Sequence, residues 1–169
     1  SSASIPASSV YHRANIPMLI FGGQGPRPFA DMGSLQDMNH VELMRPITKW
    51  SVSVAETRRL AEYVAAAFRT ATSGVPGPVF LEMPLDVLMN FCEEPQIVRP
   101  TQSRTDARAA GDPRFLERAV ALLDKAERPV LLCGGQIRFS PAREALAEFL
   151  ARRPMPAFLS GMARGMLPA

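Results

Sequence analysis

The sequence has few of the residue types that bind metals or form disulfides. It holds two histidines and two cysteines among 169 residues. Cys92 and Cys133 lie far apart, and neither they nor His12 and His40 have the spacing of metal ligands. No metal site is therefore predicted. Two isolated cysteines favour free thiols in a reducing compartment, which indicates a cytoplasmic protein.

Long apolar runs and clustered charges are also missing. No run approaches the ~20 apolar residues that a membrane-spanning helix needs, and the first residues lack the order of a signal peptide. The net charge is +3, with the basic residues scattered through helical patterns. We expect no membrane and no nucleic-acid partner. Because the chain lacks an initiator Met and stops after an apolar segment, we expect a fragment of a longer protein.

Several enzyme motifs are absent as well. There is no Walker loop, and Gly22-Gly23-Gln24-Gly25 does not have the spacing of the dinucleotide fingerprint. A Gly-x-Ser-x-Gly nucleophile elbow is not found either. On these residues alone, the sequence predicts a ligand-binding α/β protein and leaves its ligand open.

What the sequence does contain is an alternation of apolar strands and amphipathic helices. Val79–Met83 is apolar and bounded by Pro76-Gly77-Pro78 and Pro84, which is typical of a strand buried on both faces of a parallel sheet. Further strands are predicted at 16–21, 50–54, 129–133 and 155–159. Helices are predicted at 8–14, 36–44, 56–73, from 113 onward and at 141–152.

This order predicts an α/β fold with two partial parallel-sheet domains and helices on both faces. We place the domains at 1–90 and 113–169, joined by a linker at 91–112 that is rich in helix and strand breakers. Glycines follow one predicted strand in each domain. Such strand ends are candidate ligand sites because a ligand can approach the backbone closely, although a plain turn is the alternative.

An ordered set of motifs resembles one enzyme family. Gly23-Gln24-Gly25-Pro26-Arg27 is followed by Gly33-Ser34-Leu35-Gln36-Asp37 and Arg45-Pro46-Ile47-Thr48-Lys49. Later come Gly77-Pro78-Val79 to Asp86, Pro129 to Gly135, and Gly161-Met162-Ala163-Arg164-Gly165. Together they resemble the thiamine-diphosphate enzymes of the acetolactate synthase branch, which includes 2-hydroxyacyl-CoA lyases. Residues 1–90 resemble the end of the pyrimidine-binding domain, and residues 113–169 resemble the start of the central domain.

The resemblance implies an enzyme that decarboxylates a 2-keto acid and ligates the enamine to a second carbonyl, as in branched-chain amino acid biosynthesis. It implies thiamine diphosphate and Mg²⁺ as cofactors, bound mainly by segments of the enzyme that this sequence does not contain, so the fragment itself is expected to be inactive. FAD is left open, because not all relatives bind it. A homodimer or homotetramer is implied, because the family's active site forms between subunits. The alternatives are a lyase of the 2-hydroxyacyl-CoA or oxalyl-CoA decarboxylase type, and a non-catalytic nucleotide-binding α/β module.

Site residues are carried over from the resemblance by position. Gln36 matches a glutamine at the active-site entrance and is the predicted catalytic residue, while Pro26 and Leu35 match substrate-channel positions. The predicted cofactor-binding residues are Gly134, Gly135, Gln136, Gly161 and Met162. Leu35 replaces the usual Phe, and Leu85 replaces a Lys that many acetolactate synthases carry. Lys49 is interpreted as a solvated or interface lysine rather than a catalytic one.

Overall fold

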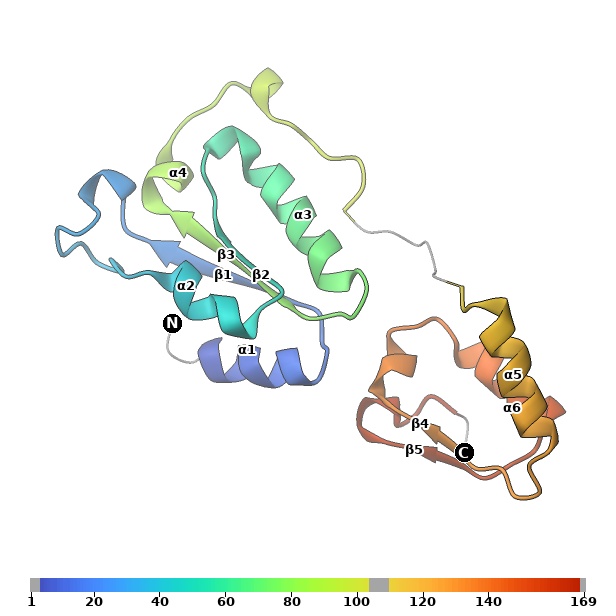
Figure 1. Cartoon of the computed structure of the whole chain (residues 1–169). Coiled ribbons are helices and arrows are strands. Elements are labelled where there is room, and N and C mark those ends of the chain that lie inside the picture. The colour runs from blue at the N-terminus through green and yellow to red at the C-terminus, as the bar shows by residue number, and fades with distance from the viewer. Residues whose placement is uncertain (1–3, 104–109, 168–169) are drawn as a thin grey trace. The chain divides into compact units, whose positions relative to one another are not determined.

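The computed structural model describes residues 4–103 and 110–167, which form two compact units, Ser1–Asp106 and Ala107–Ala169 (Figure 1). Each unit contains its own parallel sheet with helices beside it, which confirms the predicted α/β class. The predicted linker at 91–112 includes residues 104–109, which lie outside the described residues. Its bounds and the domain types assigned to either side stay predictions.

The first unit is built on a three-stranded parallel sheet. Its strands lie in the order β1 (Met18–Gln24), β3 (Pro78–Pro84) and β2 (Trp50–Ser53). The strand that comes last in the chain is therefore the middle strand, and it is buried along nearly its whole length. This confirms the reading of Val79–Met83 as a strand covered on both faces.

One face of this sheet is covered by α3 (Leu60–Thr72) (Figure 1). Ala67 and Ala71 of the helix form a fully buried cluster with Val79 and Leu81 of β3. The small alanine side chains let the helix backbone lie close to the sheet. The partly buried residues packed around this cluster are Leu19, Trp50, Val52, Tyr63 and Val64.

The other face is covered by two helices that precede β2 in the chain. The helix α2 (His40–Met44) places two buried side chains, His40 and Met44, on the side of the sheet where Phe80 and Glu82 point. The hydroxyl of Ser51 in β2 donates a hydrogen bond to the carbonyl of Val41, at 2.7 Å. The helix α1 (Ser4–Arg13) also contacts β1 and β3. Helices thus lie on both faces of the first sheet, as predicted.

Two local predictions differ from the structure, and one short helix was not predicted. Gly22 and Gly23 do not form a turn but continue β1, because they pair with Glu82 and Met83 of the central strand. The helix expected from Gln36 begins only at His40, where the side chain of Asn39 accepts a hydrogen bond from the Glu42 amide. A short helix, α4 (Leu85–Met89), follows β3 and was not predicted.

Lys49 has a structural role at the end of α3. Its ammonium group donates hydrogen bonds to the carbonyl oxygens of Thr70 and Ser73, the second at 2.7 Å. Its side-chain stem packs on Gly77, where an added Cβ would lie 3.0 Å from two of its carbons. A cation at a helix C-terminus is favourable because the last carbonyl groups lack partners within the helix.

The second unit is a two-stranded parallel sheet with two helices. Along the chain it contains α5 (Pro113–Asp124), β4 (Leu131–Cys133), α6 (Arg143–Arg152) and β5 (Ala157–Leu159). The carboxylate of Asp112 caps α5 by accepting a hydrogen bond from the Arg114 amide at 2.9 Å, as predicted. Leu132 and Phe158 pair across the two strands and are 73% and 59% exposed. Much of one sheet face is thus open.

Candidate functional site

A cavity of about 280 Å³ opens in the first unit beside the carboxyl end of β1. Its wall is mostly apolar, and the predicted catalytic residue Gln36 is one of the few polar side chains in it. The lining residues from the strands are Ile20, Phe21, Gly22, Gly23 and Phe80. A cavity of this kind can hold a small molecule whose apolar part is buried and whose polar part meets an amide.

Gln36 is held in an unusual conformation at the edge of this cavity. Its backbone is left-handed, with φ of 66°, which is uncommon for a residue other than glycine. Its side chain lies over Gly23, where an added Cβ would be 2.8 Å from the Gln36 amide oxygen. Glycine is therefore needed at position 23 because any side chain there would collide with the amide of Gln36, and not because the backbone needs a special conformation.

A buried polar group lies beneath the cavity. The Nδ1 atom of His40 is 3.3 Å from a carboxylate oxygen of Glu82 and 3.0 Å from the side-chain amide of Gln24. His40 and Glu82 are 7% and 6% exposed, so both are removed from water. Buried polar groups are costly unless they are paired, which is why these three side chains contact one another.

Sequence reasoning did not find this polar group as a site. The sequence excludes His40 as a metal ligand but assigns it no other role, and Gln24 enters only as part of a motif. Glu82 gave the one usable signal, because it is an acidic residue within an apolar run that had been assigned to a buried strand.

The predicted channel residues lie on the loop between β1 and α2. Pro26 precedes the short turn η1 (Arg27–Phe29), and Leu35 is 86% exposed next to Gln36. Neither residue lines the cavity, although both lie within a few positions of it in the chain. The structure thus brings Gln36, but not Pro26 and Leu35, to the cavity wall.

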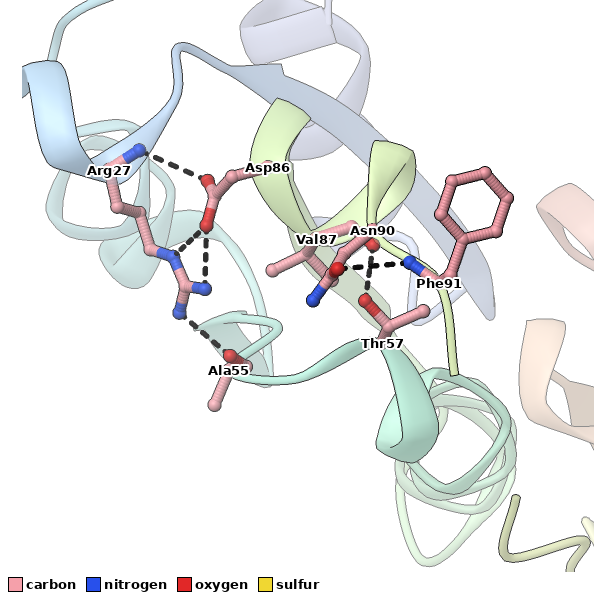
Figure 2. A network of polar contacts seen from close by, with 7 residues as sticks. All are labelled: Arg27, Ala55, Thr57, Asp86, Val87, Asn90 and Phe91. Atoms are coloured by element: carbon pink, nitrogen blue, oxygen red, sulfur yellow. Dashed lines mark hydrogen bonds and ion pairs between the residues drawn. The ribbon is translucent and has the colours of Figure 1, made fainter. Parts of the chain in front are cut away.

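Arg27 ties this loop to the helix after β3, as Figure 2 shows. Its guanidinium Nε and its backbone amide donate to the two carboxylate oxygens of Asp86, at 2.8 and 3.0 Å. Another guanidinium nitrogen donates to the carbonyl of Ala55 at 2.7 Å. Close by, the hydroxyl of Thr57 donates to the carbonyl of Val87 at 2.6 Å. Three segments that are distant in the sequence are joined here by short hydrogen bonds.

The charge of Asp86 is favoured by this arrangement. Partial burial raises the pKa of the Asp86 carboxyl, but the hydrogen bonds from the side chain and the backbone of Arg27 outweigh it. The pKa of Asp86 is therefore lower than its usual value, so this carboxyl group is ionised at neutral pH. Its role in the geometry is to fix the segment that follows Pro26.

The predicted cofactor residues of the second unit meet at the carboxyl ends of β4 and β5. Gly134 and Gly135 follow β4, while Gly161 and Met162 follow β5 in the turn η6 (Gly161–Ala163). An added Cβ on Gly135 would lie 3.3 Å from the Met162 side chain, so the two loops touch. Gly134 and Gly161 face open space, and the φ of Gly161 is +54°. Gln136 is exposed in the turn η5 (Gly135–Arg138).

The described residues do not form a metal site. Within residues 4–103 and 110–167, no cluster of three or more His, Cys, Asp or Glu side chains is placed to hold a metal ion. The cavity near Gln36 has no Lys or Arg in its wall, so it does not fit a diphosphate group. Among the described helices, none is long and apolar enough to cross a membrane.

Comparisons with known proteins show similarity along most of the chain. Residues 116–169 match the family description "Thiamine pyrophosphate enzyme, central domain". The chain is 31% identical over 156 residues to the "Probable acetolactate synthase" of Mycobacterium bovis, which covers 90% of this chain and 28% of that protein. It is 32% identical over 154 residues to the "Acetolactate synthase isozyme 1 large subunit" of Escherichia coli, covering 91% and 27%.

A second group of relatives carries a different name. The chain is 30% identical over 190 residues to the human "2-hydroxyacyl-CoA lyase 2", which covers 91% of this chain and 30% of that protein. The chain spans less than a third of the length of the curated relatives it matches. These matches include both units of the structure.

Proposed function

Since this chain belongs to the family of thiamine pyrophosphate enzymes, we propose that it is part of an acetolactate synthase-like enzyme. The complete enzyme would decarboxylate a 2-keto acid and join the remaining fragment to a second carbonyl compound. Residues 1–90 would be the end of a pyrimidine-binding domain, and residues 113–169 the start of a central domain. We also propose that the complete enzyme is a homodimer or homotetramer, because the family's active site forms between subunits. We propose that it lies in the cytoplasm, because both cysteines are free thiols.

The observation that carries this proposal is the length of the matches. The acetolactate synthases align over 154 and 156 positions, whereas the human lyase needs 190 positions to cover the same share of the chain. The lyase therefore has extra residues within this region that the chain lacks. This favours the synthase over the 2-hydroxyacyl-CoA lyase, which is the second candidate because its identity of 30% is nearly as high.

Thiamine diphosphate, when bound, supplies the electron sink for decarboxylation, and the protein supplies positioning. The chain's own contribution at this step is Gln36. Its neutral amide can donate and accept hydrogen bonds at the rim of an apolar cavity without a change of protonation. We assign to Gln36 the task of orienting the carboxylate or carbonyl of the substrate. Pro26 and Leu35 would line the channel through which the substrate enters. Most of the residues that bind thiamine diphosphate and Mg²⁺ would lie in other parts of the protein.

The experiment uses the full-length protein that contains this chain. It is supplied with thiamine diphosphate and Mg²⁺ and offered either pyruvate or a 2-hydroxyacyl-CoA. We expect condensation of pyruvate and no cleavage of the thioester, and we expect calorimetric titration to show binding of thiamine diphosphate. Gln36→Ala should lower kcat/KM by about 10–100-fold through loss of orientation. Gln96→Ala, an exposed glutamine outside the cavity, is the matched control. Cleavage of the thioester alone would favour the second candidate, and no thiamine-dependent turnover would contradict both.

For the second unit we propose that Gly134, Gly135, Gln136, Gly161 and Met162 contact a cofactor, with FAD as the first choice. The support is the open space above two of the glycines at adjoining strand ends, where a flat ligand can approach the backbone. The visible absorption of the purified full-length protein tests this. A flavin spectrum that is lost in Gly134→Val and kept in Gly111→Val would support the proposal. A colourless wild-type protein that takes up no added FAD would refute it.

A further inference from the structure

The side chain of Gln24 lies between β1 and the loop that carries Gln36. One terminal atom of its amide is 2.7 Å from the carbonyl oxygen of Gln36 and 3.2 Å from that of Met38. A carbonyl oxygen accepts hydrogen bonds and cannot donate them, so this atom is the amide nitrogen. Gln24 therefore donates two hydrogen bonds to the backbone of the loop, one on each side of residue 37.

The same amide nitrogen packs against a buried pair. It lies 3.0 Å from Nδ1 of His40, which in turn lies 3.3 Å from the carboxylate of Glu82. Because the two carbonyl oxygens use both of its hydrogens, the contact with Nδ1 is a packing contact and not a third hydrogen bond. Glu82 belongs to β3, the central and most buried strand of the sheet. A continuous series of polar contacts thus runs from the middle of the sheet through His40 and Gln24 to the backbone of Gln36.

Gln36 needs such support because its backbone conformation is unfavourable. A non-glycine residue with φ of 66° keeps that conformation only where its surroundings impose it. Two neighbouring residues of β1 impose it here. Gly23 leaves the space that the Gln36 side chain occupies, and Gln24 holds the carbonyl oxygen of the same residue.

We propose that Gln24 is a positioning residue, which, backed by His40 and Glu82, holds the Gln36 amide at the cavity so that it can orient the substrate. The proposal rests on the proposed function, because Gln36 is the group assigned to substrate. Gln24 does not touch the substrate and acts only through Gln36.

The test uses the full-length protein and the isosteric variant Gln24→Glu. A carboxylate places an oxygen against the carbonyl oxygens of Gln36 and Met38, so the loop is repelled instead of held. We expect kcat/KM for pyruvate to fall by about 10–100-fold, because small displacements of an orienting group have effects of this size. Gln24→Met, which removes the hydrogen bonds without adding charge, should act in the same direction and serves if the first variant does not fold. Gln96→Glu is the matched control and should leave kcat/KM unchanged.

A double-mutant comparison separates positioning from general stability. In the Gln36→Ala background, Gln24→Glu should cause no further fall in kcat/KM, because the group through which it acts is gone. An equal fall in both backgrounds would overturn the proposal.

A second readout does not depend on activity. Chymotrypsin should cut after the exposed Leu35 faster in Gln24→Glu than in the wild type, and by a larger factor than its cleavage after the exposed Phe91. If the rate of cleavage after Leu35 is the same in Gln24→Glu and in the wild type, Gln24 does not hold the loop, and this result alone overturns the proposal. A wild-type protein without thiamine-dependent turnover overturns the proposed function and, with it, the kinetic role of Gln24, even when the cleavage rates differ.

Discussion

Replacing Lys49 by methionine tests whether a lysine within a family motif serves the fold. Methionine keeps most of the stem that packs on Gly77 but removes the ammonium group and its hydrogen bonds to Thr70 and Ser73. A cation at a helix C-terminus contributes about 0.3–1 kcal/mol, and each hydrogen bond contributes about 0.5–1.5 kcal/mol net. Partial burial lowers the pKa of Lys49, which shows that desolvation opposes these gains. We therefore expect a loss of about 1–2 kcal/mol.

The loss can be measured in urea by the fluorescence of Trp50. This is the single tryptophan of the chain, and it stacks on Tyr63 beside the core of the first unit. For a unit of this size, 1–2 kcal/mol corresponds to a fall of about 1 M in the urea midpoint. Lys49→Arg, which keeps a cation, should recover part of the loss. The control is Lys125→Met, which changes the other lysine of the chain and lies in the second unit. Equal midpoints for Lys49→Met and Lys125→Met would refute the reasoning.

Three further predictions concern the first sheet and the strand ends. Asp86→Asn should lower the urea midpoint at neutral pH. Because the pKa of Asp86 is lowered in the folded state, the difference in urea midpoint between variant and wild type should persist down to about pH 4 and disappear as the pH falls further. A difference that stays constant to about pH 2.5 would contradict this. Gly22→Ala places a Cβ 2.5 Å from the ring of Phe80 and should cost about 1–3 kcal/mol. Adding Phe80→Leu should relieve the clash, so strictly additive losses of stability in urea would disprove this. Gly161→Ala should destabilise the full-length protein by about 1 kcal/mol and so lower its melting temperature, because φ is +54° there, whereas Gly134→Ala, with ordinary φ, should not.

The strands and long helices could be predicted because each is encoded within its own segment. Val79–Met83 is apolar between prolines, and the helix after Asp112-Pro113 has both a capping side chain and a helical period. The closeness of Gly135 and Met162 was not predicted, although the predicted parallel strands could have indicated it. Both residues follow parallel strands, and the carboxyl ends of parallel strands lie at the same edge of a sheet.

The remaining features depend on contacts between distant segments. The strand β1 continues through Gly22 and Gly23 because β3 extends far enough to pair with them, and no local signal reports that length. The left-handed backbone of Gln36 is imposed by Gly23 and Gln24, so propensity alone gave a helix there. A single sequence likewise does not report that His40 meets Glu82, since the residues come from different elements and only the packing of α2 on the sheet joins them.

The position of β3 also sets a condition on how the first unit is made. During synthesis β1 and β2 leave the ribosome first, yet in the finished sheet they are separated from each other by a strand that is translated later. Until Pro84 has emerged, neither has a hydrogen-bonding neighbour within this unit, and their apolar side chains remain accessible to chaperones. The protection of β1 and β2 that comes from pairing with β3 should therefore appear in a single step when β3 is released, rather than strand by strand.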